Sequence, residues 1–508
     1  MKNRIRRIFN WLHEKPLIPA TVSLILLGGV LIGWGASSPV GSSPDDDFHL
    51  ASIWCAESNP SEHCQPGNSS DSRIVPFDLP QSICFAFVPE QSAACQGPDF
   101  GHNNIQTVET KRGNFTSIYP PGFYFTMNKF VSGNIEKSVL LMRTVNVLIF
   151  LAAGIALLFS GYAKQQRRTL WSYLAVLTPL GLFLIPSTNP SSWEIIGISG
   201  FALGSIASFE TTRGRRWSNL VIATFCATLA IFARGDSGFF VFIAAVAVLI
   251  LNASLREKLW LPTGFIALLG TVSLFTSVIS GQASVATVGL GLSDTTTSQE
   301  MHGVTLLISN ALQLPNLWSG VFGTWGLGWL DTTMPITVPL LATGVFIAML
   351  FASIRHIEIR RILASSLLLM TLISVPLFVL QKSHASVGAL VQPRYLLPVL
   401  IVLFIVLYSG NQALDIFGVV QLICIWIALT VSQALALHTN IGRYTHGTSI
   451  KTANLNSNIE WWWDAPIQPM TIFIVTSALF SLAVFIAGTL LVNVAPSIDG
   501  SKPAARYP

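Results

Sequence analysis

The residues with the clearest potential for chemistry stand together in Ser43-Pro44-Asp45-Asp46-Asp47-Phe48-His49. This stretch directly follows the first long apolar run, so it lies where the chain is expected to leave the membrane. Three adjacent carboxylates repel one another, and at least one should have a raised pKa unless a cation lies near. Two interpretations follow. The cluster is either a solvated turn that caps a helix beginning near Phe48, or a general base held at the membrane surface.

The composition predicts an all-α membrane protein that crosses the bilayer many times. The chain has 508 residues, of which 51% are hydrophobic and only 10% are charged, whereas a soluble domain carries about 25% charged residues. No dense basic patch indicates nucleic acid as a partner. No glycine-rich phosphate loop or dinucleotide fingerprint is present. A cytosolic nucleotide is therefore not expected to supply energy or a transferred group.

Twelve apolar runs are candidates for spans, since a helix needs about 20 apolar residues to cross a bilayer. The first could be a signal peptide, but its length favours an uncleaved helix. We expect the spans at residues 17–36, 139–160, 171–187, 194–211, 217–233, 238–254, 260–279, 335–353, 362–380, 395–409, 413–436 and 469–493.

Clusters of Lys and Arg in the connections predict the orientation. Most connections after even-numbered spans carry two or three cations, and only the short one at 410–412 is neutral. By the positive-inside rule these connections and both termini are cytoplasmic. The long connections at about 38–138, 280–334 and 437–468 then lie outside. We therefore expect a multi-pass protein of the cell membrane whose active face is extracytoplasmic.

Three segments follow from this topology. They are a basic cytoplasmic N-terminus at 1–16, a transmembrane domain at 17–493 that includes the outer loop 38–138, and a cytoplasmic tail at 494–508.

Four of the six cysteines fall in the first outer loop, at Cys55, Cys64, Cys84 and Cys95. Because an exported loop is in an oxidising compartment, we expect two disulfides that staple this loop. The sequence does not determine the pairing, and the local option joins Cys55 to Cys64 and Cys84 to Cys95. Metal ligation is the alternative, which the irregular spacing disfavours.

Aromatic and basic residues lie near the outer ends of the predicted spans. Tyr119 and Tyr124 flank a Pro-Pro turn and could either line a sugar site or form an interfacial aromatic belt. Arg394 and Arg443 are suited to phosphate, because the guanidinium fork matches its oxygens. The alternative is that both arginines only reach the lipid headgroups.

The motifs, taken in order from about 40 to 465, resemble a bacterial, especially actinobacterial, family of multi-span membrane proteins. These proteins look like GT-C-type glycosyltransferases, which use polyprenyl-phosphate sugars outside the membrane. A family motif like Pro-Asp-Glu-Pro-x-His is similar to Pro44-Asp45-Asp46-Asp47-Phe48-His49, with Asp46 in place of Glu and Asp47 in place of Pro. The other matching segments are Tyr119-Pro120-Pro121-Gly122-Phe123-Tyr124, Asn189-Pro190-Ser191-Ser192-Trp193-Glu194, Pro393-Arg394-Tyr395-Leu396-Leu397-Pro398, Arg443-Tyr444-Thr445-His446-Gly447 and Trp461-Trp462.

The resemblance implies a GT-C-like fold and inverting transfer of a sugar from a polyprenyl-phosphate donor to an envelope glycan, lipid or protein. Asp45 or Asp46 would be the general base, with His49 orienting a carboxylate. The same two aspartates would hold a divalent metal (Mg²⁺ or Mn²⁺) if the reaction uses one, which the resemblance leaves open. The residues expected to bind substrate are Tyr119, Tyr124, Asn189, Glu194, Arg394, Tyr395, Arg443 and Tyr444.

Two other classes of function fit the composition. A lipid or polysaccharide transporter or flippase suits twelve spans, but it predicts internal repeats and ionisable groups near mid-membrane. The sequence shows no repeat and few such groups. A non-catalytic partner in envelope assembly is the other class, and it predicts that Asp45 and Asp46 tolerate substitution by Asn.

Overall fold

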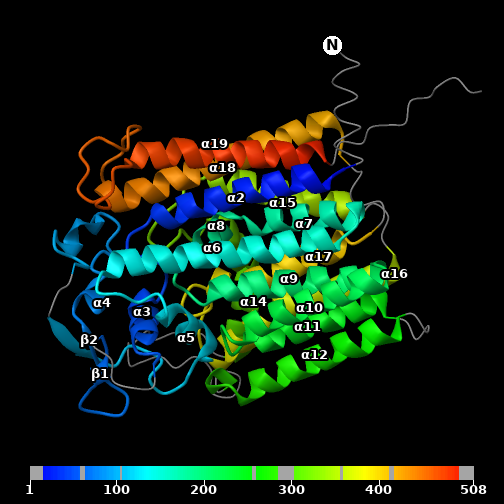
Figure 1. The fold of residues 1–508 in the computed structure, drawn as a ribbon, viewed down its shortest axis with the longest axis horizontal. Coiled ribbons are helices and arrows are strands. Elements are labelled where there is room, and N and C mark those ends of the chain that lie inside the picture. The colour runs from blue at the N-terminus through cyan, green and yellow to red at the C-terminus, as the bar shows by residue number, and fades with distance from the viewer. Residues whose placement is uncertain are drawn as a thin grey trace, which may run out of the picture.

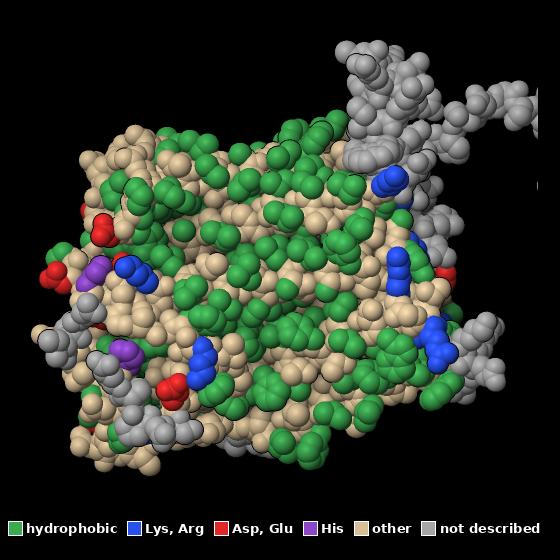
Figure 2. Space-filling model, viewed as in Figure 1, with side chains coloured by type: hydrophobic (Ala, Val, Ile, Leu, Met, Phe, Trp, Pro, Cys, Tyr) green, Lys and Arg blue, Asp and Glu red, His purple; other side chains and the backbone are tan. Residues whose placement is uncertain are grey.

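The computed structural model is a bundle of long helices that run side by side (Figure 1). The structure describes residues 15–57, 63–102, 106–253, 259–283, 303–354, 358–410 and 417–490. The predicted tail at 494–508 and most of the basic N-terminus lie outside these ranges, as do parts of five predicted connections. Figure 2 shows hydrophobic side chains over the middle of the molecule and charged ones near its two ends, as expected for a bundle that crosses a membrane.

Seven of the described helices are long and apolar enough to cross a membrane, and three shorter helices are also apolar. The prediction of a helical, multi-span protein is confirmed, whereas the number twelve is not. The seven are α2 (Leu17–Ala36), α6 (Ile135–Ser160), α9 (Ser191–Glu210), α12 (Trp260–Ile279), α16 (Ile359–Lys382), α18 (Val419–His446) and α19 (Pro469–Thr489). The shorter three are α11 (Ser237–Asn252), α15 (Thr337–Ser353) and α17 (Leu397–Leu407), and α10 (Arg213–Ile231) lies beside α9.

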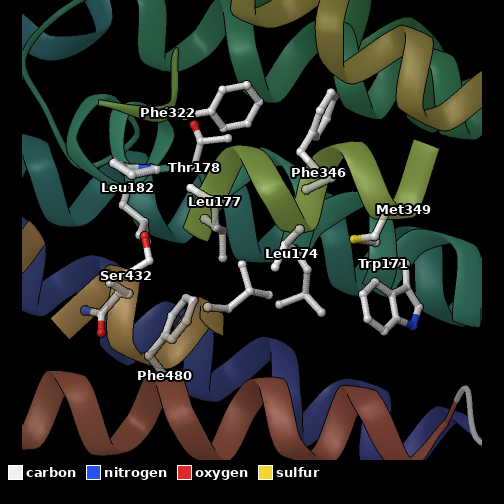
Figure 3. A pocket seen from close by; sticks show the side chains of 16 residues that line it. Trp171, Leu174, Leu177, Thr178, Leu182, Phe322, Phe346, Met349, Ser432 and Phe480 are labelled. Atoms are coloured by element: carbon white, nitrogen blue, oxygen red, sulfur yellow. The ribbon is translucent and has the colours of Figure 1, made fainter. Parts of the chain in front are cut away.

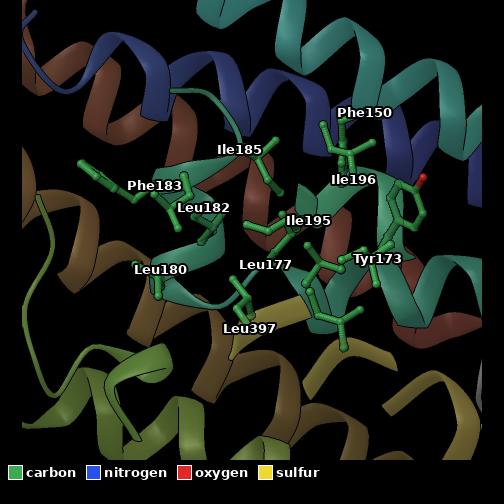
Figure 4. Close-up of a cluster of buried hydrophobic side chains, with 14 of the residues drawn as sticks. Phe150, Tyr173, Leu177, Leu180, Leu182, Phe183, Ile185, Ile195, Ile196 and Leu397 are labelled. Atoms are coloured by element: carbon green, nitrogen blue, oxygen red, sulfur yellow. The ribbon is translucent and has the colours of Figure 1, made fainter. Parts of the chain in front are cut away.

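Helix α9 lies at the centre of the bundle, and almost all of its residues are buried. Its glycines allow α10 to pack closely. A Cβ atom on Gly200 would lie 2.5 Å from the Cys226 sulfur, and one on Gly204 would lie 3.0 Å from the Asn219 carbonyl oxygen. Small residues four apart are typical of such close helix contacts in membranes. On its other sides, Ile195 and Ile196 of α9 lie in an apolar cluster with side chains of α6, α7 (Ala163–Val176) and α8 (Pro179–Leu184) (Figure 4).

The structure corrects the predicted span at 171–187, which is two helices, α7 (Ala163–Val176) and α8 (Pro179–Leu184). Proline has no N–H to continue the hydrogen bonds of α7. The Thr178 hydroxyl accepts a hydrogen bond from the Gly181 N–H at 3.1 Å and so starts α8. Helix α14 (Gly303–Ser319) lies in the segment 280–334, which the sequence assigned to an outer connection.

One end of the bundle, which we name the loop pole, carries α3 (Asp46–Trp54), α4 (Asp78–Gln81), α5 (Gly122–Asn128) and a small sheet (left in Figure 1). The sheet is antiparallel in the order β1 (Gln65–Pro66), β2 (Arg73–Pro76), β3 (Thr107–Thr110). Disulfides join Cys55 to Cys64 and Cys84 to Cys95, which is the local pairing. The predicted outer loop 38–138 therefore forms a small stapled unit on the bundle.

Candidate functional site

Asp45 stands at the loop pole in a conformation that few residues adopt. Its φ of 59° lies in the left-handed region, which Asn and Asp tolerate better than most residues. One carboxylate oxygen accepts a hydrogen bond from Arg394 Nη2 at 2.5 Å, and the other lies 3.8 Å from Arg112 Nη2. Burial raises the pKa of this carboxyl, but its charged neighbours, first of all Arg394, outweigh the effect of burial and hold the pKa below its usual value. The side chain is 39% exposed, so the site offers an ionised, accessible carboxylate.

The two neighbouring aspartates have different surroundings. Asp46 is fully buried, and its oxygens accept hydrogen bonds from the Ser43 N–H at 3.0 Å and the Thr188 hydroxyl at 2.8 Å. Burial raises the pKa of Asp46 to about 6. Asp47 accepts from Arg112 Nε at 2.8 Å and Nη2 at 3.1 Å. Among the three carboxylates, Asp45 is thus the one placed to meet a substrate.

His49 is buried beside Asp45, and its side chain contacts tyrosines. Its Nδ1 lies 2.9 Å from the Tyr124 hydroxyl, and its ring meets the Tyr119 ring edge-on with centroids 5.6 Å apart. The Asn114 side chain holds the Tyr119 backbone with hydrogen bonds of 2.8 and 2.9 Å. Burial lowers the pKa of His49 to about 3, so the ring is neutral. The hydrogen bond to Tyr124 differs from the sequence expectation that His49 orients a carboxylate.

Opposite pKa shifts at His49 and Asp46 predict how stability depends on pH. His49, lowered from 6.5 to about 3, stabilises the fold above pH 6.5 and loses this effect as the pH falls. Asp46, raised from 3.8 to about 6, has the opposite effect over an overlapping range. Burial of His49 by itself therefore predicts that the unfolding midpoint falls on acidification from pH 7 to pH 4, and burial of Asp46 by itself predicts a rise. Thermal unfolding in detergent measures their sum.

Variants at the two positions separate these contributions. His49→Gln should make the loss of stability in acid smaller, and Asp46→Asn should make it larger. Identical pH profiles in both variants and the wild type would show that neither group drives the dependence.

Two arginines from distant segments complete the cluster. Arg394, in the 3₁₀ helix η5 (Pro393–Tyr395), also donates to the Tyr395 hydroxyl at 3.1 Å, and its buried Nε has no hydrogen-bond partner among the described residues. Arg234 pairs with Asp236 at 2.7 Å and with Glu194 at 3.3 Å. Its guanidinium lies 4.9 Å from the centre of the Tyr395 ring. Among the described residues, the predicted residue Glu194 therefore reaches the cluster through Arg234.

Asn189 holds the backbone next to Asp45. Its Nδ2 donates to the Pro44 carbonyl at 2.8 Å, and its Oδ1 accepts from the Ser191 N–H at 2.9 Å. Asn189 was predicted to bind substrate, but the structure places it where it positions the strained turn at Asp45.

Arg443 and Tyr444 lie apart from this cluster, although the sequence grouped them with it. The Arg443 side chain is fully buried and donates to the carbonyls of Phe85 at 2.9 Å and Val88 at 3.1 Å, and to Asp331 Oδ2 at 2.9 Å. Both carbonyls belong to the loop closed by the Cys84–Cys95 disulfide. Because both of its terminal nitrogens donate to protein groups, Arg443 holds this loop on α18, and we leave it and Tyr444 out of the proposed substrate site.

Replacing Arg443 with Leu is therefore expected to destabilise the fold by about 3–5 kcal/mol, the usual effect of leaving a buried charge unpaired. Thermal unfolding of the purified protein in detergent measures this effect. The control is Lys129→Ala, which breaks the exposed pair between Lys129 and Glu57 and should change stability by less than about 1 kcal/mol. Equal stability of the two variants would contradict the assigned role.

The carboxylates do not fit a divalent metal. The described residues contain no group of three or more His, Cys, Asp and Glu side chains that could hold an ion. Asp46 has both oxygens occupied by Ser43 and Thr188, while Asp45 is bound by Arg394. We therefore derive no step through a metal.

The sequence interpretation missed Arg112, which touches both Asp45 and Asp47. Its guanidinium also lies 5.8 Å from the centre of the Phe48 ring. The sequence could have indicated this contact, because Lys111 and Arg112 are a basic pair in the same predicted outer loop as the three aspartates.

Comparison with known proteins identifies the family of the chain. Among solved structures, a similar one is "Crystal Structure of ArnT from Cupriavidus metallidurans in the apo state", with 12% sequence identity, a TM-score of 0.39, and coverage of 92% of this chain and 77% of that chain. No curated protein matches the chain. The family model described as "Predicted membrane protein (DUF2142)" matches residues 27–403, well over half of the sequence, so the chain belongs to the DUF2142 family of predicted membrane proteins.

Proposed function

We propose that this protein is a membrane glycosyltransferase of the GT-C type. It would transfer a sugar from a polyprenyl-phosphate donor to a glycan, lipid or protein of the cell envelope, with the loop pole on the outer face of the cell membrane. The observation that carries the proposal is the Asp45 carboxylate, which is ionised, accessible and set between the guanidinium groups of Arg394 and Arg112. A base, a cation for phosphate and aromatic faces for a sugar thus stand at one place.

Asp45 and Arg394 have separate roles in the proposed reaction. Asp45 accepts the proton of an acceptor hydroxyl while the acceptor oxygen attacks C1 of the donor sugar. The bond between C1 and the phosphate oxygen breaks, and the polyprenyl phosphate leaves with the electron pair. Arg394 donates hydrogen bonds to the leaving phosphate and stabilises its charge. Attack opposite the leaving group inverts the configuration at C1, and the proton ends on Asp45.

The contact between Arg394 and Asp45 links donor binding to the base. Without donor, Arg394 holds the carboxylate and keeps its pKa low, which weakens it as a base. A donor phosphate would compete for the same guanidinium and could also pair with its buried Nε, which lacks a partner among the described residues. Asp45 would then recover a higher pKa and take the acceptor proton.

The aromatic residues are placed to hold the sugar. Tyr119 lies against His49 and Tyr124, and Tyr395 lies against both Arg394 and Arg234. Their rings border the position of Asp45, where sugar faces can pack on apolar surface.

The test is transfer of radiolabelled sugar from several polyprenyl-phosphate donors in membranes that contain the protein. Label should move to an endogenous acceptor, and membranes without the protein give the background. Transfer no greater than background with every donor would contradict the proposal.

A further inference from the structure

A cavity lies inside the bundle, between α7, α8, α15, α18 and α19 (Figure 3). About 530 Å³ of space free of atoms lies in it and at its mouth, open solvent included. Its walls are largely apolar and include Trp171, Phe346, Met349 and Phe480, and none of the described lining residues is charged. These walls would accept an uncharged, mostly apolar molecule.

Gln433 is the exception in this lining. It is 2% exposed, and neither atom of its side-chain amide has a hydrogen-bond partner among the described residues. The neighbouring Ser432, by contrast, donates to the Val338 carbonyl at 3.0 Å. A buried polar group without a partner costs about 1–3 kcal/mol. Because Gln433 lies near the middle of α18, bulk water is far from it when the helix spans a membrane.

The break between α7 and α8 also faces this cavity. Leu177 and Thr178, which connect the two helices, are lining residues. Irregular backbone at membrane depth is tolerated where it is buried in protein or lines a cavity, and interrupted spans often form binding sites. The helix break and the unpartnered amide therefore indicate the same cavity independently.

We propose that the cavity binds a neutral lipid whose hydrocarbon chain carries one hydroxyl group, and that Gln433 hydrogen-bonds this hydroxyl. The plain hydrocarbon tail of a polyprenyl donor offers no such group. In addition, a second, smaller cavity lies beside Arg394, and residues of α8 and of η3 (Gly320–Phe322) line both cavities and stand between them. The lipid site is thus distinct from the candidate catalytic site and does not depend on the proposed transfer reaction.

Equilibrium binding to the purified full-length protein in detergent tests this proposal with two radiolabelled probes, methyl 12-hydroxystearate and methyl stearate. The wild type should bind the hydroxylated ester about five- to tenfold more tightly, as one added hydrogen bond gives. Gln433→Leu should remove this preference. Thr430→Val, which deletes a hydroxyl on the same helix outside the lining, should retain it.

A second variant keeps the proposal testable if Gln433→Leu fails to fold. Val345→Phe fills the cavity from α15 and should weaken binding of both esters. Equal affinity of the wild type for the two esters, or no binding of either, would overturn the proposal. Displacement of the bound ester by undecaprenyl phosphate would also overturn it, since the cavity would then belong to the donor tail.

Discussion

Replacing Asp45 with Asn is expected to lower the rate of sugar transfer by about 10²- to 10⁴-fold, the usual contribution of a positioned general base. Asn has nearly the same size but cannot accept the acceptor proton. It also tolerates the left-handed conformation that Asp45 adopts, with φ of 59°, so the variant should fold. The measurement is the initial rate of transfer in membranes that hold equal amounts of wild-type and variant protein.

Two other carboxylates serve as controls for this result. Asp71→Asn makes the same chemical change at an exposed carboxylate that pairs with Lys111 at 3.4 Å, and should retain activity within about threefold, because exposed ion pairs contribute little. Asp46→Asn tests the alternative that the sequence left open. Loss of activity in Asp46→Asn together with full activity in Asp45→Asn would identify the buried Asp46 as the general base.

Hydropathy predicted the simple spans well and the interrupted ones poorly. The runs 17–36 and 260–279 match α2 (Leu17–Ala36) and α12 (Trp260–Ile279), because continuous apolar residues bounded by polar ones leave little choice of ends. The run 171–187 averages over Pro179, where the helix breaks. A window of mean hydropathy registers the apolar character of such a segment and carries no information on its backbone hydrogen bonds.

The residues of the candidate site could be predicted from their motifs, but the sequence does not show which of them lie close together. Asp45, which precedes α3, and Arg394, in η5, are 349 positions apart, so only the order of the motifs suggested that they act together. Arg394-Tyr395 and Arg443-Tyr444 look alike in sequence, since both lie near a predicted outer span end. Their partners separate them, because Arg443 is enclosed by carbonyls and Asp331 while Arg394 faces an accessible carboxylate.

Replacing Arg394 with Lys is expected to lower kcat by about 10²- to 10³-fold, the usual effect of removing a donor that stabilises developing negative charge. Lysine keeps the charge but loses the planar fork that reaches Asp45, Tyr395 and a donor phosphate at once. Steady-state transfer rates at saturating donor measure the effect. Arg215→Lys, at the opposite end of the bundle, is the matched control and should leave kcat unchanged.

The pH profile of a second variant, Arg394→Gln, distinguishes catalysis from a merely structural role. In the wild type, the positive charge of Arg394 lowers the pKa of Asp45, so the base remains ionised in moderate acid. Removing that charge raises the pKa of Asp45, because burial also raises it. Arg112, 3.8 Å away, lowers the pKa much less than Arg394 does. The acid limb of kcat/KM should therefore move to higher pH in the residual activity of Arg394→Gln. A purely structural arginine would reduce the amount of folded protein and leave the acid limb in place, and that outcome would separate Arg394 from the titration of the base.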